Sequence, residues 1–327
     1  ILMSPLKILF MGTPSVAVPT LETLLESDSQ IVGVVSQPDK PAGRGQEIVT
    51  PPVACLAKEK GLPLFQPDRV KGNAEFLKIL KDLAPDVIVV VAYGKILPVE
   101  ILTLPPMKCI NLHFSLLPQY RGAAPVQWAL INGEENTGVT TFILAEKVDA
   151  GPILLQKKVL IEPEDNTELL GHRLAIAGAS LVKETLEGLK AGRLKAIPQI
   201  ENLATPAPLL KKEDGKIDWS RKNTVILGQV RGMNPWPGTY TILDGKLFKI
   251  HAVTVGAGPR ACPDRGTHGE VPLRTPGEII NITPEGIEIA CGRESLLLTE
   301  VQLEGRKRMD AATFLAGHPL QKGQRLG

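Results

Sequence analysis

The chain lacks the features that mark several large classes of protein. Its four cysteines are scattered, and no two lie at the spacing of a metal-binding or redox pair, so we expect reduced thiols in a cytoplasmic protein. No apolar run is long enough to cross a bilayer, and we expect no signal peptide at either end. The glycine fingerprint GxGxxG of dinucleotide-binding folds is also missing, which argues against a nicotinamide oxidoreductase.

The net charge is too small to indicate nucleic-acid binding by itself. The formal total is +2, spread as −4 over residues 1–189, +4 over 190–212 and +2 over 213–327. Acidic residues prevail in 1–189 and basic residues in 190–327. This distribution would suit a polyanion that contacts the C-terminal part of the chain. Solvated surface charge often has such a distribution, so the asymmetry is weak evidence.

The size of the chain predicts two domains. With 327 residues, of which 43% are hydrophobic and 22% charged, the composition is typical of soluble globular proteins with room for a core in each domain. We expect the first domain at residues 1–190, a proline-containing basic linker at 191–212 and the second domain at 213–327.

Short apolar runs alternate with helix-like stretches in the first half of the chain. The expected strands are residues 7–10, 31–36, 86–91 and 108–112. The expected helices are residues 16–27, 52–60, 73–83 and, closing the domain, 167–190. This alternation predicts an α/β domain with a Rossmann-like parallel sheet covered by helices on both faces. The unbroken apolar run at 87–91 is typical of a central, buried strand.

The pattern changes after the linker. Gly, Pro and Asp turns separate short β-rich runs at 239–243, 247–255, 277–283, 286–290 and 295–301. Asp244-Gly245 is a hairpin signal, and the runs together predict a small β-barrel interrupted by a loop at 257–276. We expect Trp236, between two prolines, to anchor the core of this domain, with a platform for stacking a base as the alternative.

Three polar side chains form a candidate site. Asn111 and His113 lie in a short apolar run, and at the strand period of two both side chains point to the same face. They combine an amide that donates hydrogen bonds with an imidazole that titrates near neutrality. Asp149 follows in a loop between two more strand-like runs. Taken alone, such an Asn-x-His pair is more often structural, and an Asp before Ala-Gly-Pro is usually a turn residue.

Longer motifs in the chain favour a functional role for these three residues. The phrase at residues 111–125 (NLHFSLLPQYRGAAP) resembles the signature of the formyltransferases that use 10-formyltetrahydrofolate. Residues 37–45 (QPDKPAGRG) and 234–238 (NPWPG) resemble the branch of that family that acts on initiator methionyl-tRNA. Residues 10–14 and 91–98 match as well, so the resemblance runs nearly from end to end.

The resemblance implies a fold, a reaction and a set of residues. It implies a Rossmann-like formyltransferase domain followed by a smaller barrel resembling an OB-fold, with 10-formyltetrahydrofolate as co-substrate and methionyl initiator tRNA as partner. It assigns catalysis to Asn111, His113 and Asp149. Phe114 stands where relatives commonly have glycine, so we expect a tighter floor beside His113.

The chemistry of formyl transfer indicates a role for each of the three residues. The Asn111 amide would stabilise the oxyanion of the tetrahedral species, a role worth about 10²–10³ in rate. His113 would take the proton of the attacking amine, worth roughly 10²–10⁴, and Asp149 would orient the imidazole and favour its charged form. Because the donor is already activated on a folate nitrogen, we expect neither a metal nor a covalent nucleophile, and Ser115 is expected in a turn.

Folate is expected beside the strand at 86–91, where the carboxyl ends of parallel strands meet in a crevice. A pterin needs an apolar slot and backbone hydrogen bonds. The expected folate-binding residues are Tyr93, Gly94, Ile96, Leu97, Ser115, Leu116, Leu117 and Pro118. An ordinary core strand and turn is the alternative that these residues leave open.

Residues 36–50 form an unusually long connection, rich in proline and glycine. Such a loop can reach into a large substrate, and the resemblance implies that it engages the acceptor end of the tRNA, with Arg44 as its functional arginine and Lys40 nearby. Arg306, Lys307 and Arg308 would add phosphate contacts. For both segments a merely solvated charged surface is the alternative.

Other functions fit parts of this pattern. A 10-formyltetrahydrofolate hydrolase or a sugar-nucleotide formyltransferase would share the Asn-x-His and Asp site, and the basic loop at 36–50 favours the tRNA enzyme over both. A non-catalytic RNA-binding protein on a nucleotide-binding fold would leave His113 without a purpose. We expect a monomer.

Overall fold

The computed structural model describes residues 5–42, 47–256 and 274–327, and its contacts divide the chain into two compact units. The first unit comprises Ile1–Pro125, Asn136–Leu160 and Leu170–Pro208. The second comprises Val126–Glu135, Ile161–Leu169 and Leu209–Gly327. The contacts therefore divide the chain at Pro208, inside the expected linker, and add two short stretches of the first half to the second unit.

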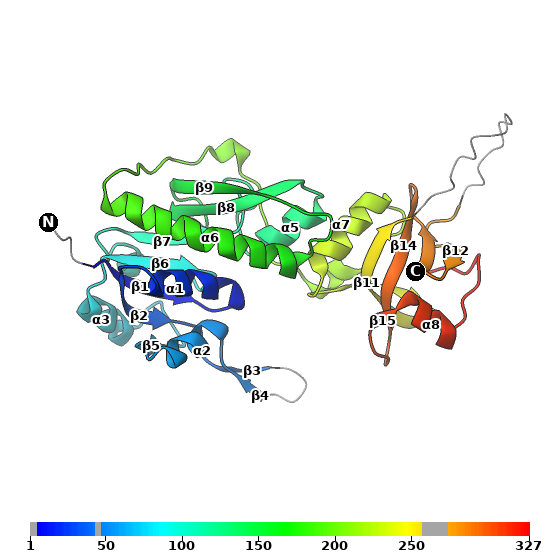
Figure 1. Ribbon diagram of the computed structural model, residues 1–327, viewed down its shortest axis with the longest axis horizontal. Helices are drawn as coiled ribbons and strands as arrows, with labels where there is room; N and C mark the ends of the chain where they lie inside the picture. Colours follow the sequence, from blue (N-terminus) through cyan, green and yellow to red (C-terminus); the bar gives the residue numbers. More distant parts are fainter. Residues whose placement is uncertain (1–4, 43–46, 257–273) are drawn as a thin grey trace. The chain divides into compact units, whose positions relative to one another are not determined.

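The first unit is built on a seven-stranded sheet (Figure 1). Its order is β5 (Leu64–Phe65), β2 (Gln30–Val35), β1 (Lys7–Gly12), β6 (Val87–Val91), β7 (Cys109–His113), β8 (Asn136–Ile143) and β9 (Ile153–Leu160). The pairs from β5 to β7 are parallel, which confirms the predicted parallel sheet. The pairs β7–β8 and β8–β9 are antiparallel, a direction that the hydrophobic pattern had not indicated.

Helices cover both faces of this sheet. They are α1 (Val18–Leu25, preceded by the 3₁₀ turn η1, Ser15–Ala17), α2 (Pro52–Glu59), α3 (Ala74–Leu83), α4 (Val99–Leu102) and α6 (Thr167–Lys190). On one face, Ile88 and Val90 of β6 share an apolar core with Phe76 of α3 and Ile101 of α4. On the other face, Leu112 of β7 packs so closely against α6 that a Cβ at Gly178 would overlap it. Alternate residues of one strand thus face opposite layers.

The strand register puts Asn111 and His113 on a single face. Val90 pairs with Asn111 in the parallel β6–β7 ladder, and Val90 belongs to the core on the α3 side. Asn111 and His113 therefore share the α3 side, whereas Leu112 between them faces α6. Because β6 and β7 are parallel, the segments that leave their carboxyl ends begin at one edge of the sheet.

The second unit contains a six-stranded antiparallel sheet with helices. Its path is β10 (Thr239–Leu243), β11 (Lys246–Val255), β14 (Ser295–Leu303), β13 (Gly286–Ala290) and β12 (Ile279–Thr283), and β15 (Met309–Asp310) pairs with β14. The helices are α7 (Asn223–Met233) and α8 (Ala311–Gly317), and α5 (Pro125–Ile131) lies almost wholly in this unit. The expected β-rich second domain is confirmed, and residues 257–273 of its predicted loop lie outside the described residues.

Local sequence signals explain two details of this unit. Asp244 and Gly245 both have positive φ, 50° and 75°, which is the geometry of a type I′ hairpin turn between β10 and β11. Trp236 is 50% exposed, so the prediction that it anchors the core was wrong. Trp219 holds that place, buried at 5% exposure with its indole N–H donating to Thr241.

Across the part of the chain that the structure describes, no helix is long and apolar enough to cross a membrane.

Candidate active site

A cavity of about 530 Å³ opens at the carboxyl ends of β6 and β7, in the first unit. Three polar residues from separate segments line it: Asn111 and His113 from β7, and Asp149 from the connection between β8 and β9. Most of the remaining lining is apolar and comes from the segments after β6 and β7 and from the connection between β8 and β9, with Lys95 and Glu146 as the other charged residues. The structure therefore brings the three predicted catalytic side chains to one cavity.

The imidazole of His113 is buried and held in one orientation. Only 5% of the residue is exposed, and Nε2 lies 2.8 Å from the carbonyl oxygen of Tyr120. Since a carbonyl can only accept, Nε2 carries a proton and donates it, which leaves Nδ1 as the basic nitrogen of the neutral ring. Nδ1 faces Oδ2 of Asp149 at 3.7 Å.

Two opposing influences set the protonation of His113. Burial lowers its pKa below the ordinary histidine value because the charged ring loses its hydration. The Asp149 carboxylate and the hydrogen bond to Tyr120 oppose this and raise the pKa. Burial is the larger effect, so the ring is held neutral with a carboxylate ready to stabilise its protonated form.

The Asp149 carboxylate is positioned by a backbone N–H group. Its Oδ2 accepts a hydrogen bond of 2.8 Å from the backbone N–H of Gly122, and its own φ of 49° is unusual for a residue other than glycine. Gly122 has φ of 126°, and a Cβ there would lie 2.6 Å from the carbonyl oxygen of Ala207. A glycine is therefore required at position 122, where the backbone passes close to Ala207. This close approach places the Gly122 N–H at the Asp149 carboxylate.

Asn111 differs from its two neighbours in the cavity because its carboxamide has no hydrogen-bond partner among the described residues. The residue is partly exposed, and no hydrogen bond to its side chain is found within residues 5–42, 47–256 and 274–327. An amide N–H₂ at the cavity wall can therefore donate to a bound molecule without breaking a protein contact.

The wall contributed by the segment after β6 is shaped by its backbone. The carbonyl of Tyr93 accepts from Thr13 Oγ1 at 3.1 Å and from Gln37 Nε2 at 3.0 Å. Gly94 has φ of 78°, and a Cβ there would lie 2.5 Å from the Gln37 amide nitrogen. Tyr93, Gly94, Ile96 and Leu97, which were expected to bind folate, all line the cavity. Phe114, buried at 8% exposure, lines it beside His113.

Residues 115–118, which were also expected to bind folate, are not among the residues that line the cavity. These four residues, Ser115, Leu116, Leu117 and Pro118, form a turn that is bonded to β8 and β9 instead. Thr140 Oγ1 donates to the Ser115 carbonyl and accepts from the Leu117 N–H, and Gln156 donates to the Leu117 carbonyl. Ser115 Oγ donates to the Gln119 carbonyl at 2.6 Å, which is the turn role expected of it.

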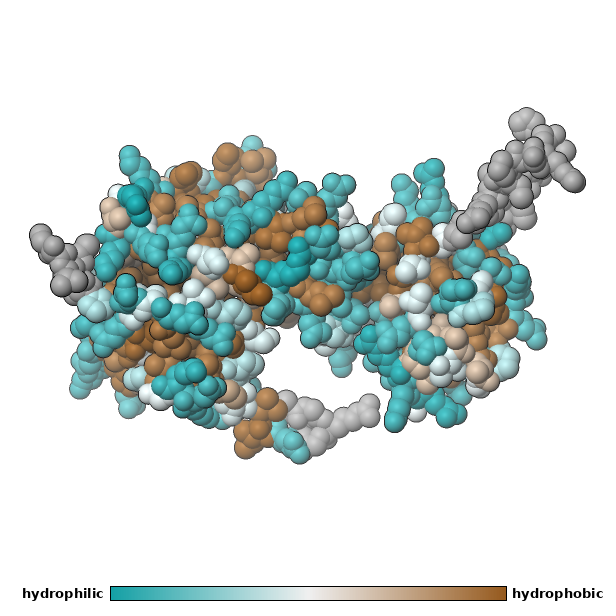
Figure 2. All heavy atoms as spheres, in the orientation of Figure 1, coloured by the Kyte–Doolittle hydropathy of each residue, from teal (hydrophilic) through white to brown (hydrophobic). Residues whose placement is uncertain are grey.

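The connection at 36–50 is partly ordered as a hairpin rather than a plain loop. β3 (Lys40–Ala42) pairs with β4 (Glu47–Val49), and Lys40 donates to Gln37 at 3.4 Å. Ile48 and Val49 are 73% and 51% exposed, and hydrophobic surface appears on this hairpin in Figure 2. Arg44 lies outside the described residues.

The basic run of the second unit follows β14. Arg306 and Lys307 are exposed, whereas Arg308 forms two hydrogen bonds with the Glu300 carboxylate, which raises the pKa of Arg308. Arg308 is therefore less available to a phosphate than its two neighbours.

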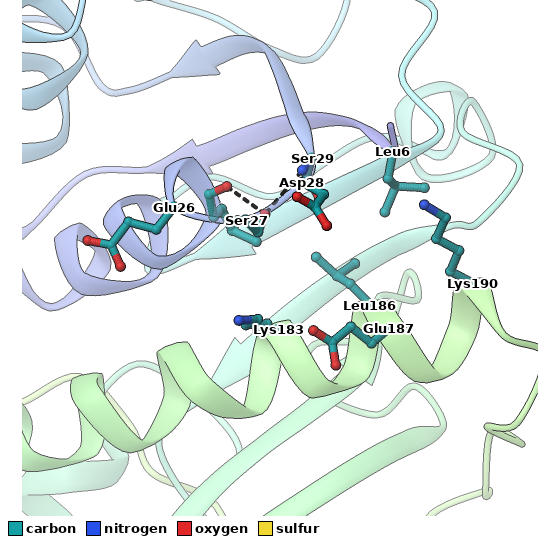
Figure 3. Close-up of a pocket in the computed structure, with 10 residues that line it drawn as sticks. Leu6, Glu26, Ser27, Asp28, Ser29, Lys183, Leu186, Glu187 and Lys190 are labelled. Carbon is teal, nitrogen blue, oxygen red and sulfur yellow. Dashed lines mark hydrogen bonds between the residues drawn. The ribbon is translucent and has the colours of Figure 1, made fainter. Parts of the chain in front are cut away.

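A second cavity, of about 380 Å³, lies at the opposite edge of the first unit's sheet (Figure 3). It is lined by side chains that precede β1 and β2 and by the last turns of α6, among them Asp28, Lys183 and Glu187. Ser27 Oγ donates to the Leu24 carbonyl and accepts from the Ser29 N–H, so both serines serve the local turn. The described part of the chain contains no group of three or more His, Cys, Asp or Glu residues that could hold a metal ion.

Three residues that hold the candidate site in place escaped the sequence reasoning, and of these Gly122 lines the cavity. Tyr120 and Gly122 act through backbone groups, and Gln199, described below, reaches the site from 50 residues beyond Asp149. The turn residues between 118 and 125 were the only local signal for the first two, and nothing local indicates Gln199.

Comparisons with known proteins cover the whole chain. Residues 6–186 match the family described as "Formyl transferase", and residues 209–319 match "Formyl transferase, C-terminal domain". Methionyl-tRNA formyltransferases of Geobacter sulfurreducens and Geotalea daltonii are 47% and 46% identical to this chain, and each alignment covers 98% of the relative and 98–99% of this chain. A crystal structure of HypX from Aquifex aeolicus in complex with tetrahydrofolic acid has a TM-score of 0.60 at 16% identity, over 99% of this chain and 51% of the HypX chain. That likeness concerns the fold.

Proposed function

The chain belongs to the formyltransferase family, and from this premise we propose that it transfers a formyl group from 10-formyltetrahydrofolate to the α-amino group of methionyl initiator tRNA. The observation that carries the proposal is the single cavity that holds the Asn111 carboxamide and a buried imidazole facing a carboxylate. The relatives' shared name, at 45–47% identity over nearly the full chain, supports the choice of acceptor.

The reaction begins when the amine nitrogen of the methionyl group attacks the formyl carbon. A carbon–nitrogen bond forms, the carbonyl oxygen becomes negatively charged, and the attacking nitrogen must lose a proton. When the bond between the formyl carbon and the folate nitrogen breaks, that nitrogen takes up a proton and tetrahydrofolate leaves. The site must therefore stabilise one oxyanion and handle a proton on each of two nitrogens.

Each polar residue of the cavity fits one of these requirements. The Asn111 N–H₂, which holds no other partner among the described residues, is suited to donate to the oxyanion. The neutral His113 ring offers Nδ1 as the base, because Nε2 already donates to Tyr120. Asp149, 3.7 Å from Nδ1, stabilises the imidazolium that forms. The donor is already activated, so this step calls for no metal.

The folate donor is best accommodated along the segment after β6. Tyr93, Gly94, Ile96 and Leu97 combine apolar surface with backbone groups that can bond a pterin. The backbone of the turn at 115–118 is held by β8 and β9, and any contact of Ser115, Leu116, Leu117 and Pro118 with folate stays a prediction.

The tRNA would be engaged by the hairpin at 40–49 and by the basic run at 306–308. Lys40 and the exposed apolar residues of β4 are accessible to a large substrate. We predict that Arg44→Ala weakens formylation of charged tRNA with little loss of folate binding, and that Arg69→Ala, which removes an exposed arginine elsewhere, leaves formylation unchanged. An unchanged rate for the Arg44 variant would refute the role of Arg44. A protein that acts on charged tRNA would work in the cytoplasm, and we expect it to do so as a monomer.

The test is direct formylation of methionyl initiator tRNA with 10-formyltetrahydrofolate. We expect formylmethionyl-tRNA as the product, and a loss of roughly 10²-fold or more in rate for His113→Gln. The exposed His172 on α6 provides the matched control, and His172→Gln should be fully active. Release of free formate without formylated tRNA would instead identify a hydrolase, and transfer only to an amino sugar nucleotide would identify the sugar enzyme.

A further inference from the structure

Residues 197–207, which we call the strap, belong to the first unit and contact two segments next to the cavity: the loop after β7 and the start of β9. Ile197 pairs with Ile153 at the start of β9, and Pro206 pairs with Arg121. The Arg121 N–H donates to the Thr205 carbonyl at 2.8 Å, and the Ala207 N–H donates to the Arg121 carbonyl at 2.6 Å. The strap is therefore bonded both to the loop after β7 and to the start of β9.

Gln199 is the side chain through which the strap reaches both catalytic loops. Its Nε2 donates to the backbone carbonyls of Asp149 at 2.8 Å and Gly151 at 2.7 Å. Its Oε1 accepts from Nε of Arg121 at 3.0 Å and from Nη2 at 2.7 Å. Two donors and two acceptor sites are all a glutamine side chain has, so every one is used.

The position of Arg121 explains why these four bonds matter. Tyr120, on one side of it, supplies the carbonyl that fixes His113, and Gly122, on the other side, supplies the N–H that fixes Asp149. A shift of Arg121 would move both backbone groups together. Gln199 joins this segment to the backbone of Asp149 itself, whose φ of 49° must be held by contacts from outside the residue.

We propose that Gln199 is a positioning residue for the proposed formyl transfer: by tying the Arg121 segment to the Asp149 turn, it sets the relation between the His113 imidazole and the Asp149 carboxylate. The inference rests on the proposed function for its kinetic consequence only. The geometric consequence, the placement of Asp149 beside Nδ1, can be measured whatever the substrate is.

The outer side of Arg121 is held by a second, more exposed contact. Its guanidinium, 10% exposed, also donates to the Glu201 carboxylate at 2.9 and 3.1 Å, and Lys147 reaches the same carboxylate at 2.8 Å. The hydrogen bonds from Arg121 and then Lys147 lower the pKa of Glu201 to about 2. Within the described part of the chain, the Glu201 carboxylate bonds Arg121 and Lys147 and makes no direct link to Asp149.

The electrostatic consequence for His113 has a definite sign. Asp149 raises the pKa of His113, and the other charged residues lining the cavity are Lys95 and Glu146. If Asp149 moves away, burial acts with less opposition and the pKa of His113 falls further. A base that titrates lower moves the acid limb of the kcat/KM profile to lower pH, while the misplaced site lowers the plateau.

Three variants test this inference. Gln199→Met removes all four bonds at similar volume, and Gln199→Glu keeps the acceptor for Arg121 but replaces the donors to Asp149 and Gly151 with a carboxylate. Asn202→Ala is the matched control, because Asn202 is an exposed amide on the same strap. We expect kcat to fall on the order of 10²-fold in both Gln199 variants, as for a misplacement of about 1 Å, with KM for the folate nearly unchanged.

The pKa of His113 distinguishes a positioning role of Gln199 from a purely structural one, because loss of stability alone would leave that pKa unchanged. We would follow the His113 imidazole nitrogens by NMR in ¹⁵N-labelled protein, with the His113→Gln variant as assignment control, and expect a lower pKa in Gln199→Met, which adds no charge of its own. Gln199 variants that match Asn202→Ala in both kcat and His113 titration, or that lose activity only in proportion to lost folded protein, would overturn the proposal. A wild-type enzyme inactive on methionyl-tRNA but with a shifted His113 in the variants would overturn the proposed function and leave the positioning role standing.

Discussion

Replacing Gly122 with alanine tests whether the delivery of one backbone N–H controls the site. The new Cβ would lie 2.6 Å from the Ala207 carbonyl oxygen, about 0.8 Å inside an ordinary contact of 3.4 Å. The new Cβ is attached directly to the Gly122 backbone, and the oxygen it meets belongs to the Ala207 backbone. Both backbone segments are hydrogen-bonded, so the contact must be relieved by moving backbone and not a flexible side chain. The φ of 126° adds strain of about 1–3 kcal/mol for a residue other than glycine.

The displacement should appear in catalysis more than in binding. A loop shifted by close to 1 Å takes the Gly122 N–H away from Asp149, and misplacement on that scale costs about 10²-fold in rate. We therefore expect Gly122→Ala to lower kcat by about two orders of magnitude, measured by formylation of methionyl-tRNA. The free energy of unfolding, measured with urea, should fall by about 1–3 kcal/mol.

Gly61 provides the matched control for the backbone strain. It also has positive φ, 64°, but a Cβ there would meet no atom within 4 Å. Gly61→Ala should lower the free energy of unfolding by about 1–2 kcal/mol and leave kcat unchanged. The reasoning is refuted if Gly122→Ala retains kcat within about twofold of the wild type, because the contact with Ala207 would then exert no force on Asp149.

Three further predictions concern individual groups of the cavity. Burial lowers the pKa of His113, so kcat/KM should be constant at neutral pH and fall only as the pH drops below the ordinary histidine pKa. A fall in kcat/KM that begins at a pH above the ordinary histidine pKa would contradict a neutral, buried base. Asn111→Ala should lower kcat by about 10²–10³ at an unchanged melting temperature, and a loss confined to KM would exclude oxyanion stabilisation. The Tyr93 hydroxyl is buried without a hydrogen-bond partner in the described structure, and burial raises its pKa to about 12, so Tyr93→Phe should leave the free energy of unfolding unchanged or raise it; a loss above about 1 kcal/mol would reveal an unseen partner.

Much of the fold follows from local pattern. The apolar run at 87–91 becomes the fully buried β6, and the amphipathic stretch at 167–190 becomes α6 with the expected bounds. Asn73 caps α3 by accepting from the N–H of Phe76, and Asp244-Gly245 forms its hairpin turn. In each case the decisive interactions lie within one turn or one strand pair, so neighbouring residues determine the outcome.

Other features depended on contacts between distant segments. The antiparallel direction of β8 and β9 and the half-exposed Trp236 are set by what each segment packs against, which periodicity does not encode. The resemblance implied that the turn at 115–118 binds folate, and only the tertiary structure shows that Thr140 and Gln156 bind its backbone from two other strands. Hydrogen bonds across 20 to 40 residues have no signature in local sequence.

The candidate site divides along the same line. The sequence by itself determined which groups were chemically competent, because an amide and an imidazole two residues apart on a strand must share a face. Only the tertiary structure decided that Asp149 faces Nδ1 of His113, that Nε2 is already committed to Tyr120, and that Gln199 spans both loops. Side-chain chemistry and strand period are local properties, whereas an approach of 2.7 to 3.7 Å between residues 36 to 78 positions apart is set by the packing of the whole unit.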